Sequence, residues 1–165
     1  MRCSLLAVTA ALITAGSLSA QDPLPSGIAV GHQAPGAAVQ TLDGKPANLR
    51  GYLGQKPVVM EFWARWCPNC RELAPALGKA QAEYKDRVTF LTIAVSVDQT
   101  PAEVAAFAAA NHLPAPVLYD VTGAAVDAYD VPGTSYVVVV DRSGKVVYTG
   151  AGGSQVIESA VRKAL

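Results

Sequence analysis

The sequence predicts an α/β domain in which a central mixed β-sheet is covered by helices on both faces. Short runs rich in valine, isoleucine and aromatic residues alternate with segments whose apolar residues recur every three or four positions. The last two runs flank a short turn and precede a helical segment, so we expect the sheet to end in a hairpin and the chain in a helix. With 165 residues, of which 51% are apolar, the chain can bury the core of one domain.

The charge of the chain is balanced, because 13 lysine and arginine residues face 13 aspartate and glutamate residues. This balance argues against a nucleic-acid-binding protein and against a protein held on a membrane surface by electrostatics. Three cysteines are too few for a small domain built on disulfides. These counts indicate a near-neutral globular domain without a nucleic-acid partner, and we expect it to be a monomer.

The first twenty residues differ from the rest of the chain. Arg2 is the only charged residue of Met1–Ala20, an apolar run follows it, and small residues end the segment. This order is typical of a secretory signal peptide, with an uncleaved membrane anchor as the alternative. Residues 21–30 are rich in proline and glycine and indicate a linker, which leaves 31–165 as the folded domain. We therefore expect an exported, periplasmic domain that is either released or anchored through its first twenty residues.

The first half of the domain predicts a hairpin, a central strand and a helix. Asp43-Gly44 is a turn signal between Val39–Leu42 and Ala47–Leu49, the two strands of a small N-terminal hairpin. Pro57–Trp63 is a short apolar run, as expected of a buried central strand. After Cys67 the period changes, because apolar residues recur at helical spacing: Leu73, Ala76, Leu77 and Ala80.

The second half continues the alternation of strands and helices. Pro101 and Pro114 bound a helix inserted between two strands, and Ser154 is expected to cap the last helix. In chain order the predicted elements are strand Val88–Val97, helix Ala102–Ala110, strand Val117–Tyr119, helical turns Gly123–Tyr129, strand Tyr136–Val140, its hairpin partner Lys145–Tyr148 and a helix to Leu165. Strands that alternate with helices in this way imply one α/β sheet.

Two cysteines lie where the central strand ends and the helix begins, in the string Trp66-Cys67-Pro68-Asn69-Cys70. The free amide N–H groups and the dipole of a helix N-terminus favour a thiolate, so the pKa of the Cys67 thiol should lie below about 8.5. Cys70 follows one turn later on the same helix face and can reach the first sulfur. Cys67 is therefore the expected nucleophile for a target disulfide, and Cys70 the thiol that resolves the mixed disulfide.

Two other uses of the cysteine pair are open from the pattern alone. A structural zinc site needs about four protein ligands, and beyond the pair the domain offers only His32 and His112, in segments without ligand spacing. A purely structural disulfide would close a very short loop, which constrains almost no chain entropy. We therefore expect no metal, and no cofactor other than the redox-active disulfide Cys67–Cys70.

Glu61 is the second informative residue, because it places a carboxylate in the middle of the apolar central strand. Burial disfavours the charged form and should raise the pKa of this carboxyl. We interpret Glu61 as a proton acceptor for Cys70 during resolution of the mixed disulfide. The alternative is a carboxylate that points outward or is satisfied by a nearby lysine. Around the pair, Trp66 is expected to shield the site and, with Pro68 and Asn69, to face the substrate.

Longer motifs surround these residues. They are Gly31-His32-Gln33-Ala34-Pro35, Leu42-Asp43-Gly44-Lys45, Val59-Met60-Glu61-Phe62-Trp63-Ala64-Arg65-Trp66-Cys67-Pro68-Asn69-Cys70-Arg71-Glu72-Leu73-Ala74-Pro75, Val97-Asp98, Tyr129-Asp130-Val131 and Asp141-Arg142-Ser143-Gly144-Lys145. From about residue 31 to its end the sequence resembles the thioredoxin superfamily. More closely, it resembles the exported thiol-disulfide oxidoreductases related to the thioredoxin-like proteins of cytochrome c maturation.

The resemblance implies a thioredoxin-like fold in which Cys67 is the nucleophile, Cys70 the resolving thiol and Glu61 a buried acid. It also implies partners, namely cysteine pairs of other proteins, apocytochrome c among them, and a membrane protein that supplies electrons. The acidic residue and the likeness to reductive proteins favour a reductant.

One position departs from the family pattern. The family places a cis-proline directly before the strand that here begins at Tyr136, and in the same register this chain has Gly133-Thr134-Ser135. A cis bond before a residue other than proline costs about 3–4 kcal/mol. In the family, the residue before that proline pairs its backbone with the substrate chain, so the resemblance implies that Thr134 and Ser135 line the substrate site.

Two further functions stay open at this point. Ala34-Pro35 and the turn Asp141–Gly144 also occur in peroxiredoxins, which suggests a thiol peroxidase. Those proteins carry a threonine three residues before the peroxidatic cysteine, where this chain has Ala64. A non-catalytic binding module with the same fold is the third hypothesis, and the missing cis-proline is its support.

Overall fold

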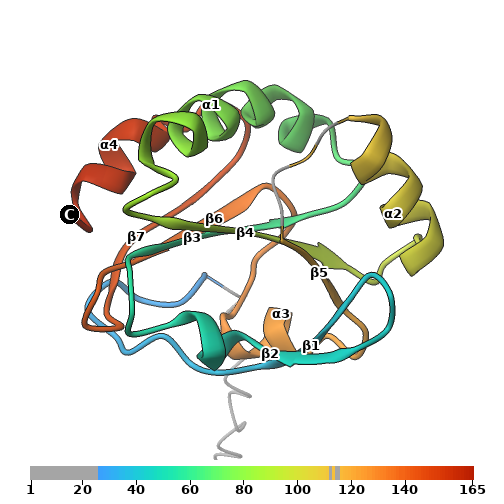
Figure 1. The fold of residues 1–165 in the computed structure, drawn as a ribbon, viewed down its shortest axis with the longest axis horizontal. Coiled ribbons are helices and arrows are strands. Elements are labelled where there is room, and N and C mark those ends of the chain that lie inside the picture. The colour runs from blue at the N-terminus through green and yellow to red at the C-terminus, as the bar shows by residue number, and fades with distance from the viewer. Residues whose placement is uncertain (1–25, 112, 114–115) are drawn as a thin grey trace, which may run out of the picture.

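The computed structural model describes residues 26–111, 113 and 116–165, and within them seven strands form one mixed sheet (Figure 1). The strands are β1 Ala38–Thr41, β2 Pro46–Asn48, β3 Val58–Trp63, β4 Thr89–Val95, β5 Val117–Asp120, β6 Tyr136–Val140 and β7 Val146–Ala151. The helices are the 3₁₀ helix η1 Leu49–Tyr52 and the α-helices α1 Pro68–Tyr84, α2 Pro101–Ala110, α3 Ala124–Ala128 and α4 Ile157–Arg162. This architecture confirms the predicted α/β fold.

The sheet has the order β2-β1-β5-β4-β3-β6-β7. β3 pairs in parallel with β4 and antiparallel with β6, so it lies in the interior of the sheet. β1 and β2 form the predicted N-terminal hairpin at one edge, and β6 and β7 form the predicted late hairpin at the other. α2 is the predicted inserted helix and connects β4 to β5.

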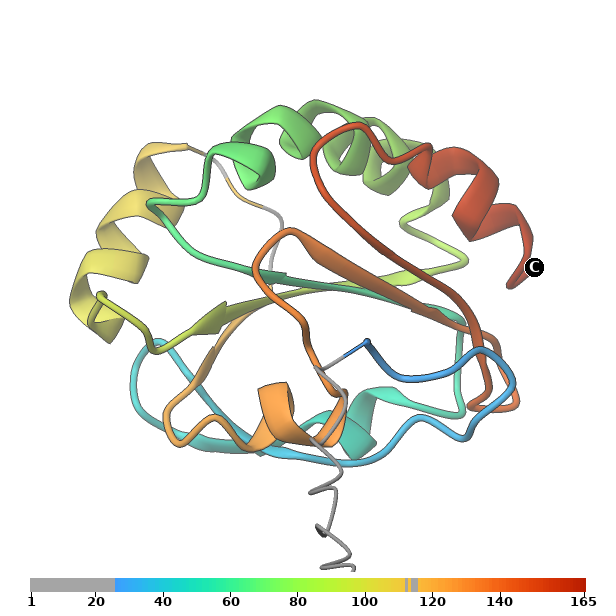
Figure 2. The same cartoon turned by 180° about the vertical axis from the view of Figure 1, so that it is seen from behind.

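Alternation along β3 distributes its side chains between two cores. Met60 and Phe62 pack with Tyr129, which follows α3, on one face of the sheet. Val59 packs with Leu73 of α1 on the other face. Figures 1 and 2 show α1, α2 and α4 on one side of the sheet and α3 and η1 on the opposite side. The sheet is therefore covered on both faces, as the sequence predicts.

α1 begins directly after the turn that follows β3, with Cys67 as its N-cap. The Cys67 N–H donates to the carbonyl of Ala64 at 3.1 Å and closes this turn. Pro68 occupies the first position of the helix, where a missing N–H removes no hydrogen bond. Further along, buried residues recur at helical spacing and fix the helix on the sheet: Leu73, Leu77, Ala80 and Tyr84. The local sequence thus places the first cysteine at a helix N-terminus.

The predicted signal or anchor segment, residues 1–20, and the first half of the predicted linker lie outside the described residues. From Ser26 onward the chain runs along the domain. The Ile28 N–H donates to the carbonyl of Tyr129 at 2.9 Å, and the Ile28 side chain packs against the core beside α3. The packed domain therefore includes Ile28. None of the helices in the described part of the chain has the length and hydrophobicity that crossing a bilayer requires.

The start of the last helix differs from the prediction. α4 begins at Ile157 with Val156 as its N-cap, and no side chain caps it. Ser154 lies in the preceding turn, in which the Gly152 N–H donates to the carbonyl of Ser135 at 3.1 Å. The predicted Ser154 cap is therefore wrong, because this turn is held against the start of β6 and the helix begins only after it.

Leu73→Ala should lower the free energy of unfolding by about 2–5 kcal/mol, because the fully buried Leu73 joins α1 to the sheet. Urea unfolding of the oxidised protein measures this change. Lys79→Ala is the matched control, since Lys79 is an exposed residue of the same helix and its loss should change stability by no more than about 0.5 kcal/mol. Equal effects of the two substitutions would contradict this account of the core.

Candidate active site

The two cysteines form a disulfide at the N-terminus of α1, with their Cα atoms 5.3 Å apart. The Cys67 sulfur also accepts the backbone N–H of Cys70 at 3.0 Å. This N–H is one of the first-turn donors that have no partner within the helix. The same donor and the helix dipole would stabilise a thiolate at Cys67 once the disulfide is reduced.

The disulfide is nearly covered, while its neighbours in the chain are exposed. Cys67 has 2% and Cys70 has 7% of its surface exposed, whereas Trp66 has 41% exposed. Pro68 and Asn69, between the cysteines, are also exposed. The three residues predicted to face the substrate are therefore accessible around a recessed disulfide.

Glu61 lies on the face of β3 that α1 covers, and only 8% of its surface is exposed. Its carboxyl lines a cavity of about 270 Å³ that Cys70 and Ala74 of α1 and Phe107 of α2 also line. One carboxyl oxygen is buried without a hydrogen-bond partner, and no cation pairs with Glu61 among the described residues. The structure thus excludes both the outward-pointing and the lysine-paired alternatives.

Burial raises the pKa of Glu61 from 4.5 to about 8, because desolvation disfavours the charged carboxylate. The side chain is therefore mostly protonated at neutral pH. A carboxyl of this kind, in the cavity that Cys70 also lines, can hold or accept a proton in the range where thiols titrate.

Thr134 and Ser135 lie just beyond the paired part of β6, next to the end of β3, because the ladder between these strands ends at the pair Phe62 and Tyr136. Ser135 is fully buried and has a φ of 61°, a conformation that is uncommon for serine. Its hydroxyl donates to the carbonyl of Gly152 at 3.0 Å. Thr134 is half-buried and is the more accessible member of the predicted substrate-binding pair.

The structure adds Gln155, which sequence reasoning missed. Its amide nitrogen donates to the carbonyls of Ser135 and Gly152 at 3.0 and 2.7 Å. The Gln155 oxygen accepts the hydroxyl of Tyr148 at 3.1 Å. A polar residue beside a turn gives no signal of such contacts, because Tyr148 lies in β7 and Ser135 lies in the loop before β6.

No three His, Cys, Asp or Glu side chains gather into a metal-binding group in the described part of the chain. Of the two histidines weighed for zinc, His32 is exposed, and His112 lies outside the described residues.

Known proteins resemble this chain in sequence and in fold. Residues 29–165 match the sequence profile of the Redoxin family. The chain belongs to the Redoxin family.

Curated relatives of this redoxin carry names that agree with the site. Thioredoxin-like protein YneN of Bacillus subtilis is 35% identical over 121 residues, which are 73% of this chain and 70% of that protein. Thiol-disulfide oxidoreductase ResA of Bacillus thuringiensis is 30% identical over 118 residues, which are 72% of this chain and 67% of that protein.

Solved structures that resemble this chain are also described as thiol-disulfide exchange proteins. A thioredoxin-family thiol:disulfide interchange protein from Chlorobium tepidum has a TM-score of 0.69 at 27% identity, covering 82% of this chain and 97% of that one. A secreted Mycobacterium tuberculosis disulfide oxidoreductase, homologous to E. coli DsbE, has a TM-score of 0.64 at 29% identity, covering 77% and 93%. The predicted thioredoxin-like fold is confirmed, and this redoxin is a thiol-disulfide oxidoreductase.

Glu61→Gln should stabilise the oxidised protein increasingly as pH rises from about 4.5 to 8. The folded parent holds the Glu61 proton up to pH about 8, whereas the unfolded chain releases it near 4.5, so the parent loses stability across this window. Each unit of pKa difference corresponds to about 1.4 kcal/mol, so the free energies of unfolding of Glu61→Gln and the parent should differ by several kcal/mol at the upper end of this pH window. Urea unfolding at both ends of the window measures this difference.

Glu103→Gln is the control, because hydrogen bonds from Thr100 lower the pKa of the exposed Glu103 and its removal should bring no such gain. A Glu61→Gln effect that is the same at every pH would contradict the raised pKa of Glu61.

Proposed function

We propose that this redoxin is exported and acts as a reductant, exchanging the Cys67–Cys70 dithiol with disulfides of partner proteins. The observation that carries the proposal is the cysteine pair at the N-terminus of α1 with the Glu61 carboxyl in the cavity beside Cys70. The names of the relatives support thiol-disulfide exchange as the chemistry.

In the proposed cycle, the Cys67 thiolate attacks one sulfur of a partner disulfide, and the other partner sulfur leaves as a thiolate. The Cys70 thiolate then attacks the Cys67 sulfur of this mixed disulfide, and the first partner sulfur leaves. The partner disulfide has gained two electrons and is reduced, while the Cys67–Cys70 bond has formed. A membrane-bound dithiol donor would return two electrons and restore the dithiol.

The ionised form of Glu61, which is the minor form at neutral pH, is the proposed acceptor for the proton of Cys70. This proton must leave before the Cys70 sulfur can attack. A thiol has an ordinary pKa of about 8.5, far above that of an exposed carboxyl. Because burial raises the pKa of Glu61 to about 8, proton transfer between the two groups is nearly balanced in energy.

The proposed partner contacts are Trp66, Pro68, Asn69 and Thr134, and Ser135 contributes by shaping the loop that carries Thr134. The first three are exposed around the disulfide, and a partner backbone would pass beside the half-buried Thr134, since Ser135 is fully buried. The resemblance to proteins of cytochrome c maturation makes apocytochrome c the first partner to test.

Export is supported by two observations. The pattern of Met1–Ala20 is typical of a signal peptide, and one structural relative is described as secreted. We propose a periplasmic location, with a retained Met1–Ala20 segment acting as an anchor if it is not cleaved.

Redox titration of the domain against glutathione or dithiothreitol tests the proposal. A reductant should show a Cys67–Cys70 potential near or below about −200 mV, the range of glutaredoxins and thioredoxin. A potential near about −120 mV would instead make this redoxin a disulfide donor. The absence of a reversible two-electron couple would favour the non-catalytic binding module.

Matched cysteine variants separate the two sulfurs. Cys67→Ser should abolish reduction of insulin disulfides, because no nucleophile remains. Cys70→Ser should instead accumulate a mixed disulfide at Cys67, which gel electrophoresis without reductant detects. Peroxide consumption with a thiol donor is the parallel assay, and a rate above that on insulin would favour the thiol peroxidase.

Ser135→Pro should change rates on protein disulfides by about ten- to hundredfold, the scale of a misplaced substrate, with a smaller effect on the redox potential. Proline cannot adopt the φ of 61° found at Ser135, so the loop before β6 must change shape. Ser135→Gly, which tolerates this φ, is the control and should keep the parent rates. Equal rates of parent and Ser135→Pro on two protein disulfides would refute a role of this loop in partner binding.

A further inference from the structure

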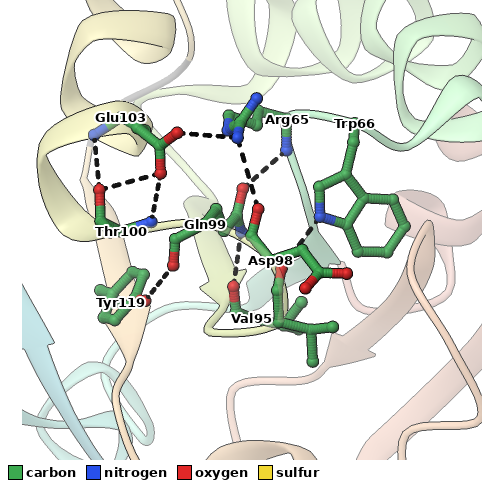
Figure 3. Close-up of polar contacts among 9 residues, drawn as sticks. Arg65, Trp66, Val95, Asp98, Gln99, Thr100, Glu103 and Tyr119 are labelled. Atoms are coloured by element: carbon green, nitrogen blue, oxygen red, sulfur yellow. Dashed lines mark hydrogen bonds and ion pairs between the residues drawn. The ribbon is translucent and has the colours of Figure 1, made fainter.

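Two loops meet beside the disulfide, and Figure 3 shows the polar contacts that join them. The active-site turn, residues 64–67, leads from β3 into α1, and the loop 96–100 leads from β4 into α2. The indole N–H of Trp66 donates to the carbonyl of Val97 at 3.0 Å. The residue directly before Cys67 is thus tied to the second loop.

Gln99 makes the most buried of these contacts (Figure 3). Only 6% of its surface is exposed, and both ends of its amide are used. The amide oxygen accepts the backbone N–H of Arg65 at 2.9 Å, and the amide nitrogen donates to the carbonyl of Val95 at the end of β4. The Gln99 carbonyl accepts the hydroxyl of Tyr119 from β5 at 2.7 Å. One residue therefore attaches the active-site turn to two buried strands.

The other contacts of Arg65 are weaker. Its guanidinium pairs with Glu103 at 2.8 Å, but the side chains of this pair are 36% and 47% exposed, and exposed pairs contribute little to stability. The Arg65 Nη2 atom lies 3.4 Å from the carbonyl oxygen of Asp98, which is at the long end for a hydrogen bond. Loss of the Gln99 amide would remove the acceptor of the part-buried Arg65 N–H and a donor to the buried Val95 carbonyl, and buried hydrogen bonds are more costly to lose. Gln99 is therefore the stronger restraint on the turn.

We propose that Gln99 is a positioning residue for disulfide exchange at Cys67 and Cys70; this inference rests on the proposed function. In the oxidised form the S–S bond itself holds the two sulfurs together. In the dithiol form the place of Cys67 depends on the turn before it. Gln99 holds the Arg65 N–H, and so it restricts the movement of the turn that carries Cys67 in the dithiol form. This restriction raises the effective concentration of the Cys67 sulfur at the Cys70 sulfur. Loss of this restraint makes the disulfide easier to reduce.

Gln99→Met tests the inference, because methionine keeps a similar volume and removes both side-chain hydrogen bonds. The fractions of dithiol and disulfide are measured for the full chain in glutathione or dithiothreitol buffers. The equilibrium constant for disulfide formation should fall about three- to tenfold, which is about 14 to 30 mV at 29.6 mV per tenfold.

Three further variants define the cause. Gln99→Glu is the control: burial favours the protonated carboxyl, which keeps an oxygen that can accept the Arg65 N–H and an O–H that can donate to the Val95 carbonyl. This variant should stay within about twofold of the parent constant. Ala106→Gly weakens α2 at an exposed position, away from both loops, and should leave the constant unchanged. The asparagine side chain of Gln99→Asn is too short to make both hydrogen bonds, so this variant should shift the constant in the same direction as Gln99→Met. It keeps the test available if Gln99→Met does not fold.

An unchanged constant in Gln99→Met and Gln99→Asn would overturn the inference. An equal fall of the constant in Ala106→Gly would also overturn it, because the effect would then come from a general loss of stability. An equal fall in Gln99→Glu would exclude the hydrogen bond to the Arg65 N–H as the cause. A parent without any reversible dithiol–disulfide couple would instead refute the proposed function.

Discussion

The burial of β3 on both faces is the constraint on which the site depends. All six residues of Val58–Trp63 are buried, so alternation along the strand directs every second side chain toward α1. Glu61 is one of these. A register shift by one residue would move the carboxyl to the opposite core and turn Met60 and Phe62 toward α1. The packing that stabilises the sheet therefore also holds Glu61 in the cavity that Cys70 lines.

This position is costly for a carboxyl. One oxygen of Glu61 has no hydrogen-bond partner, and a buried charge without compensation would be costlier still. The raised pKa lowers this cost, because the group is mostly neutral at neutral pH. An apolar residue would pack in the same place without the penalty. A strand selected for stability alone has no reason to keep the acid, so its cost is an argument for chemistry at Cys70.

Local patterns in the sequence were sufficient for the elements that carry the chemistry. The apolar run of β3 and the helical spacing of Leu73 and Leu77 both lie within one element, and the cysteine at their junction becomes the helix N-cap. Long-range contacts were not predictable in this way. Gln99 bonds a residue 34 positions earlier, and Gln155 one 20 positions earlier, so no local spacing reports either.

The same distinction explains the wrong helix cap. Ser154 satisfies the local rule for an N-cap, but the hydrogen bond between Gly152 and Ser135 decides where the turn ends. Likewise, the resemblance to the thioredoxin superfamily locates Ser135 in the chain without giving its positive φ, since serine adopts that conformation only when its surroundings impose it.

Two glutamines restrain the loops on either side of β3's end, and their chemical type matters. Gln99 holds the turn that leads to Cys67, and Gln155 holds the residue that precedes β6. An amide supplies a donor and an acceptor without a charge. The amide of Gln99 therefore fixes the geometry of the turn without adding a charge near the cysteines. The electrostatic environment of the cysteines is set by the N-terminus of α1 and by the protonation of Glu61.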